Sequence, residues 1–133
     1  MKRITFIFLL LFCLTANAAV ENYLHQSVYS VRNDFPDLHF YANNGEFDVY
    51  MSLNGNSVFG FKNGYVVNEQ HILEGSNDDL KSYYNSLIDY YVNKRPKDSI
   101  RGEGNTILFL FDDFYVQISY VPYKETSLLI SLY

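Results

Sequence analysis

Cysteine and tryptophan are almost absent from this chain of 133 residues. Its one cysteine is Cys13, and it contains no tryptophan. A chain with a single cysteine forms no intramolecular disulfide, and it lacks the cysteine pairs on which many structural zinc sites are built. The stability of the domain must therefore come from a hydrophobic core, which a chain of this length can bury.

Long apolar segments are also scarce, and the only one lies at the N-terminus. Two basic residues precede an apolar run from Ile4 to Leu14, and residues 16–18 (Ala-Asn-Ala) supply the small side chains that signal peptidase reads. The run is too short to span a bilayer. We therefore expect residues 1–18 to be a cleaved signal peptide and residues 19–133 to form one exported domain, periplasmic or secreted. Retention of the segment as an anchor is the alternative.

Basic residues are in the minority as well. On cleavage, Lys and Arg fall from 10 to 8 while Asp and Glu stay at 15, so the net charge moves from −5 to −7. An acidic domain is a poor candidate for binding nucleic acid or an anionic membrane surface. It is compatible with a basic protein partner, and the simplest effect of its charge is solubility.

Two segments have the periodicity of helices. Asn77 to Arg95 is the stronger, because its apolar residues recur at offsets that fit one face of a helix, and Pro96 ends it. Val20 to Phe35 carries a narrower stripe and ends before Pro36. The apolar stripe of the first segment consists of Leu80, Tyr83, Tyr84, Leu87, Ile88, Tyr91 and Val92.

Most of the remaining chain has the pattern of short strands. Three turns rich in Asn and Gly, centred on Asn44, Gly55 and Asn63, indicate an antiparallel meander. We expect a polar loop at Pro96 to Asn105, and a central strand at Thr106 to Phe111, which is apolar on both faces. The expected strands are residues 38–42, 46–53, 57–61, 65–73, 106–111, 114–121 and 127–133.

These elements predict a two-layer α+β domain. The expected order is α-ββββ-α-βββ, with an antiparallel sheet of about six to seven strands and both helices on one face. In this outline the chain resembles small exported bacterial α+β proteins of unknown function. It is also similar in outline to cystatin-like modules and to modules of the beta-lactamase-inhibitor-protein type. The latter resemblance implies protein binding through an open sheet face and loops, and it carries over no functional residue.

Residues with catalytic or metal-binding chemistry are dispersed along the chain. His39 and His71 lie on expected strands, and together with Glu69 they would begin a zinc site if those strands paired. No serine lies in a Gly-x-Ser-x-Gly turn, and Ser57 is best interpreted as the start of a strand. We therefore predict no catalytic residue, no metal ligand and no cofactor.

The remaining signal is aromatic. Tyr50, Phe59, Phe61 and Tyr115 lie on expected strands, and rings on the sheet face opposite the helices would offer a large contact area. The alternative is that these rings pack on one another. We predict a non-enzymatic, exported binding module that recognises a protein, as an inhibitor or an immunity protein does, with these four residues in the interface.

Two other functions remain open. The first is a small hydrolase or metal-dependent enzyme that uses His39, His71 and nearby carboxylates. The second is a structural subunit of the envelope that pairs through an edge strand, such as Leu128 to Tyr133.

Overall fold

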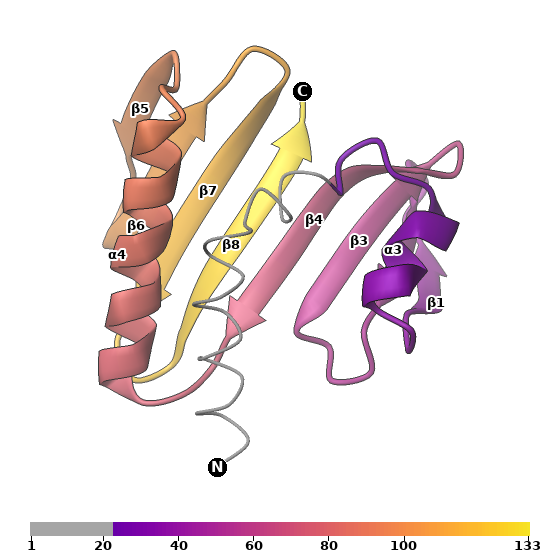
Figure 1. Ribbon diagram of the computed structural model, residues 1–133, viewed down its shortest axis with the longest axis horizontal. Coiled ribbons are helices and arrows are strands. Elements are labelled where there is room, and N and C mark those ends of the chain that lie inside the picture. The colour runs from indigo at the N-terminus through magenta and orange to yellow at the C-terminus, as the bar shows by residue number, and fades with distance from the viewer. Residues whose placement is uncertain (1–22) are drawn as a thin grey trace.

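The computed structural model describes residues 23–133, so the predicted signal peptide lies outside the described residues. Within them the chain forms two helices and one antiparallel sheet of eight strands (Figure 1). Each helix is followed by four strands. The elements are α3 (Val28–Asp34), β1 (His39–Asn43), β2 (Asp48–Met51), β3 (Ser57–Lys62), β4 (Tyr65–Leu73), α4 (Asn77–Asn93), β5 (Asp98–Arg101), β6 (Asn105–Leu110), β7 (Phe114–Val121) and β8 (Glu125–Leu132).

The predicted α+β class and antiparallel sheet are confirmed, but the expected number of strands is too low. The additional strand is β5, which lies inside the segment predicted to be a polar loop. All four of its residues are exposed, so it has no alternation of buried and exposed side chains for a pattern to reveal. Backbone pairing with β6 defines it, from Asp98 opposite Leu110 to Arg101 opposite Ile107.

The sheet consists of two meanders that meet through their last strands. The strand order is β1-β2-β3-β4-β8-β7-β6-β5, so β4 pairs with β8 at the centre and β1 and β5 form the edges. The C-terminal strand therefore lies in the middle of the sheet, and the expectation that Leu128 to Tyr133 forms an edge is wrong. β6 lies beside an edge strand, so the prediction of a central strand at Thr106 to Phe111 is also wrong.

The two halves repeat one arrangement. β1 and β5 begin at His39 and Asp98, and β4 and β8 end at Leu73 and Leu132, with the same separation along the chain in both cases. Gln70 lies opposite Leu129 at the junction, and these two residues also correspond under that separation. The halves are therefore related by an approximate twofold axis at this pair, and positions in one half can be compared directly with positions in the other.

α3 is shorter than the helix predicted from Val20. Within the described residues the helix begins at Val28, and the Ser27 side chain caps it by accepting a hydrogen bond from the Ser30 amide. The preceding backbone pairs with β4 instead: the His25 amide donates to the Val66 carbonyl, and the Val66 amide donates to the Gln26 carbonyl, both at 2.9 Å. Residues 23–25 form a turn in which His25 has a left-handed φ of 71°, a conformation that a right-handed helix does not contain, so the apolar spacing overestimated the length of the helix.

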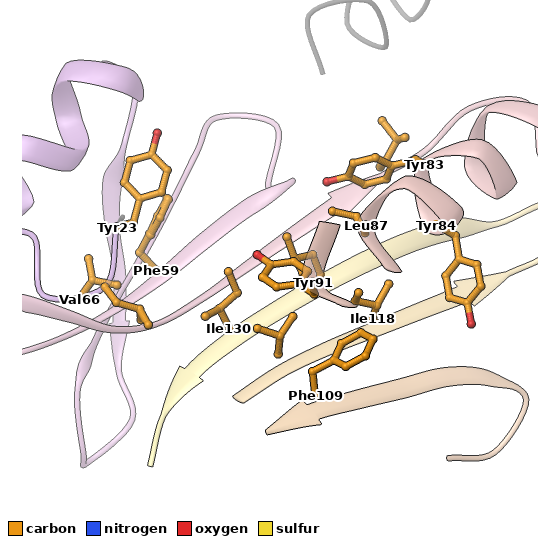
Figure 2. Packing of buried hydrophobic residues seen from close by; sticks show 14 of the residues in the cluster. Tyr23, Phe59, Val66, Tyr83, Tyr84, Leu87, Tyr91, Phe109, Ile118 and Ile130 are labelled. Atoms are coloured by element: carbon orange, nitrogen blue, oxygen red, sulfur yellow. The ribbon is translucent and has the colours of Figure 1, made fainter. Parts of the chain in front are cut away.

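α4 agrees with the prediction over almost its whole length. It begins after Ser76, whose side chain accepts from the Asp79 amide at 3.2 Å, and ends two residues before the predicted Arg95. Val92 is the exception within the stripe, because half of its side chain is exposed. The buried residues of α4 are Leu80, Tyr83, Tyr84, Leu87 and Tyr91. In Figure 2 the α4 residues Tyr83, Tyr84, Leu87 and Tyr91 lie over the strands that carry Ile118, Ile130 and Phe109.

Strand register defines two faces of the sheet. Residues directly opposite each other on antiparallel strands share a face. One such row crosses β3, β4, β8, β7 and β6, and it consists of Phe59, Glu69, Ile130, Val116 and Phe109. All five are buried. We call the side that carries this row the core face.

Two contacts link the core face to α4 and to the residue after α3. The Thr126 hydroxyl of β8 donates to the Leu80 carbonyl of α4 at 2.7 Å. Phe35, the C-cap residue that follows α3, places its ring centre 5.2 Å from that of Phe59.

Gly60 of β3 lies where no side chain can be accommodated. An added Cβ would lie 2.5 Å from Asn68 Oδ1 and 2.7 Å from Cδ2 of Phe47. We expect Gly60→Ala to lower the free energy of unfolding by about 1–3 kcal/mol through overpacking, measured by urea denaturation. Gly75→Ala is the matched control, because its nearest neighbour would lie 4.0 Å away, at Asp79. Equal stability of the two variants would contradict this packing.

Candidate functional site

The four aromatic residues predicted to bind a partner do not share a face. Tyr50 lies opposite Phe59, and both therefore belong to the core face, as does Phe61 two residues along β3. Phe59 and Phe61 are 0% and 2% exposed. The expectation that these two rings form an exposed surface is wrong, because a period-2 pattern groups the residues of one strand but does not say which group is buried.

The other two aromatic residues remain at least partly accessible. Tyr50 is half-buried, with its ring 5.1 Å from that of Phe61 and the Arg32 guanidinium of α3 5.8 Å from its centre. Tyr115 lies on the opposite side of the sheet, where its ring is 6.0 Å from that of Tyr133. Of the four predicted residues, Tyr115 alone belongs to the side away from the core face.

That opposite side, the outer face, is continuous across the sheet. Val58, Gln70, Leu129, Gln117 and Leu108 lie opposite one another on β3, β4, β8, β7 and β6. All five side chains are half-buried, because neighbours on the same face shield them. The outer face is therefore a surface in which apolar and uncharged polar residues alternate.

Charged residues are confined to the rim of the outer face. Lys62 is the last residue of β3, Glu125 is the first of β8, and Asp98 lies on the edge strand β5. Charged residues make up 19% of the whole chain, yet the described strands place none in the interior of this face. The interior residues are Val58, Gly60, Asn68, Gln70, Ile72, Ser127, Leu129, Ser131, Tyr115, Gln117, Ser119, Thr106, Leu108 and Leu110.

A second candidate site lies on the core face, where three polar side chains are connected in a line. Ser57 of β3 lies directly opposite His71 of β4, and its Oγ is 2.9 Å from Nδ1 of the imidazole. The other ring nitrogen, Nε2, is 2.9 Å from Oε1 of Glu69. Glu69 is fully buried, and the His71 side chain is 14% exposed. The imidazole thus joins a buried carboxylate to a half-buried hydroxyl.

Three aromatic rings surround this imidazole. The ring centres of Phe59, Phe35 and Tyr23 lie 5.5, 6.2 and 6.4 Å from that of His71. The Tyr23 hydroxyl donates to Oδ2 of Asp34 at 2.6 Å, which fixes the ring in place. Aromatic walls exclude water and strengthen the hydrogen bonds within the cluster.

The zinc site considered from the sequence is not assembled. His39 lies on the edge strand β1, which β2 and β3 separate from β4, and its Nδ1 is 3.2 Å from the Asp37 carbonyl oxygen. Of the group considered, the structure brings together only His71 and Glu69. In the part of the chain that is described, no three His, Cys, Asp or Glu residues form a group able to hold a metal ion.

The partner that the sequence did not reveal is Ser57. Glu69 and His71 are two residues apart on one strand, so their shared face was predictable. The contact with Ser57 depends on a register shift between Gly60 and Phe61: Phe61 lies opposite Val66, but Gly60 lies opposite Asn68. Neither a motif nor a spacing marks such a shift in this sequence.

The fold and these two sites define an α+β protein built from two four-stranded halves around one antiparallel sheet. Comparison of the chain with protein-family models, with characterised proteins and with solved structures gives no match. Neither helix formed by residues 23–133 is long and apolar enough to cross a membrane.

Proposed function

We propose that this chain is an exported protein-binding module that recognises its partner through the outer face of the sheet. In this proposal α3 and α4 both cover the core face, which leaves the outer face free. The contacts of Leu80 with Thr126 and of Phe35 with Phe59 support that arrangement. The observation that carries the proposal is the uncharged interior of the outer face in an otherwise acidic protein.

The size of this face favours a protein over a small ligand. At a spacing of about 4.8 Å between strands, the eight strands span roughly 34 Å. With roughly 20 Å of strand length, the face offers on the order of 700 Å², close to the ~800 Å² that each partner buries in a standard protein interface. A small molecule would leave most of it uncovered.

The charge pattern of the outer face also indicates the kind of partner. A basic protein would require acidic side chains within the contact, and here Asp98 and Glu125 lie only at the rim. We therefore propose a partner whose contact surface is itself largely uncharged. Because few ion pairs would form, the affinity should change little between low and moderate salt.

A charge placed in the centre of the outer face tests this proposal. Immobilised wild-type protein, Leu129→Lys and Val92→Lys would be exposed to exported proteins of the same source at two salt concentrations. Leu129 lies in the middle of the face, whereas Val92 is an exposed apolar residue of α4. A partner held by wild type and by Val92→Lys should bind Leu129→Lys at least ~10-fold more weakly, since a buried unpaired charge is costly.

Circular dichroism would first establish that all three proteins are folded. Capture of the same proteins by Leu129→Lys and by wild type would contradict binding through the outer face. Capture that disappears at moderate salt would point instead to the acidic residues elsewhere on the chain.

A further inference from the structure

We propose that Ser57 is a reactive nucleophile, activated by His71 as general base, and that it accepts acyl groups from activated esters. This reactivity goes beyond the binding role proposed above, and it belongs to the core face rather than to the outer face.

The second half of the fold carries aliphatic residues at the positions of this cluster. The residues that correspond to Ser57, Glu69 and His71 under the repeat are Val116, Leu128 and Ile130, and the pairing is preserved, with Val116 opposite Ile130. All three are fully buried aliphatic residues.

The same positions of the same fold are thus filled by aliphatic residues in one half and by a hydroxyl, a carboxylate and an imidazole in the other. Burying a carboxylate is costly unless it is paired. The second half shows that the fold does not require polar groups at these positions. The fold alone therefore does not explain the polar cluster of Ser57, Glu69 and His71.

The geometry supplies a chemical reason. A hydrogen bond from Nε2–H of His71 to the carboxylate of Glu69 leaves the lone pair of Nδ1 directed at Ser57 Oγ. In this tautomer the imidazole accepts the hydroxyl proton, which is the function of a general base beside a serine nucleophile. The buried carboxylate then stabilises the imidazolium that forms, and Glu69 acts as a positioning residue.

The reaction balances with an ester as the acyl donor and water as the second reactant. Ser57 Oγ bonds to the acyl carbon while its proton moves to Nδ1 of His71. The bond from the acyl carbon to the ester oxygen then breaks, and the leaving alcohol takes that proton. Water, deprotonated in turn by His71, releases the acid and restores the serine.

Ser57 is placed where a reagent can reach it. It is the first residue of β3 and directly follows the turn at Asn54 to Asn56, and its side chain is half-buried rather than enclosed. The donor would approach from this end of β3, because Glu69 and Phe59 on the other side of the imidazole are fully buried.

A fluorophosphonate probe, which reacts with activated serines, tests the proposal without knowledge of the natural ester. The full chain would be incubated with the probe, and the labelled residue identified by peptide mass spectrometry. We expect labelling at Ser57, absence of labelling in Ser57→Ala, and unchanged labelling in Ser86→Ala, which alters a half-buried serine of α4. His71→Asn should lower the rate at Ser57 at least ~100-fold, the contribution typical of a general base.

Two further variants separate chemistry from folding. Glu69→Leu combined with His71→Ile copies the second half of the fold and retains Ser57, so it should fold and remain unlabelled. Glu69→Gln should lower the rate of labelling at Ser57, because an amide does not stabilise the imidazolium that forms, and Glu69→Asp, which keeps the carboxylate, should restore part of that rate; a purely structural effect would make the shorter Asp the slower of the two. Absence of label at Ser57 in the wild type, or equal rates in wild type and His71→Asn, would overturn the proposal.

Discussion

His71→Ala is expected to lower the free energy of unfolding by about 3–5 kcal/mol, whereas Glu69→Leu and His71→Ile together should leave it unchanged or raise it by about 1–4 kcal/mol. The single change removes the imidazole that is hydrogen-bonded to a fully buried carboxylate. The double change removes both polar groups and substitutes the residue types found at Leu128 and Ile130. The opposite signs arise because a buried charge without its partner is costly, while an aliphatic pair of similar size needs no partner.

Urea denaturation of the wild type, the single variant and the double variant measures these differences. Gln70→Ala is a suitable control, because Gln70 lies between the two residues on β4 but points to the outer face. Its effect should stay within about 0.5 kcal/mol. If the double variant proved as unstable as His71→Ala, the fold would require the polar cluster. The aliphatic residues of the second half would then not show that the cluster serves a chemical function.

Phe59→Ala is expected to destabilise the protein by about 3–5 kcal/mol, the usual cost of removing a large buried aromatic side chain. Phe59 is fully buried, and its ring centre lies 5.2 Å from Phe35 and 5.5 Å from both Tyr23 and His71. The cavity would therefore open between β3, the end of α3 and the polar cluster. Thermal or urea unfolding of the variant measures the loss.

Tyr115→Ala is the matched change on the outer face. Its ring is half-buried and contacts Tyr133, so its removal should cost about 1 kcal/mol or less. A stable Phe59→Ala protein that had lost partner binding would reverse the assignment of the two faces. The comparison thus distinguishes a core residue from a surface residue among the aromatic residues that the sequence grouped together.

Local sequence determined the elements whose pattern is self-contained. The apolar residues of α4 repeat with the helical period, Ser76 caps it, and Pro96 follows its end, so its limits were predictable to within two residues. The Asn/Gly turns likewise predicted the hairpins of the first half. In these segments the residues that carry the pattern are the same residues that form the helix or turn.

Elements defined by a partner strand were not predictable in this way. β5 exposes every side chain and is a strand only because β6 pairs with it. The segment before α3 has helical spacing, yet it forms a turn at residues 23–25 and gives its next hydrogen bonds to Val66 of β4. In both cases the hydrogen-bond partners are backbone groups distant in the sequence. The side chains of the segment do not indicate this pairing.

The candidate sites depended on the same kind of information. Because of the register shift beside Gly60, Ser57 lies opposite His71 rather than opposite Gln70, and Glu69 and His71 lie on the core face. A shift of one residue moves every later side chain of a strand to the other face.

By itself, the sequence determined an acidic α+β domain with one strongly amphipathic helix and a first half built as a meander. Only the tertiary structure decided which aromatic residues are buried, that the halves join through β4 and β8, and that Ser57, His71 and Glu69 meet. Periodicity determines which residues of one element share a face. Backbone hydrogen bonds determine which elements pair, and because every residue except proline can form them, the sequence does not specify the pairing.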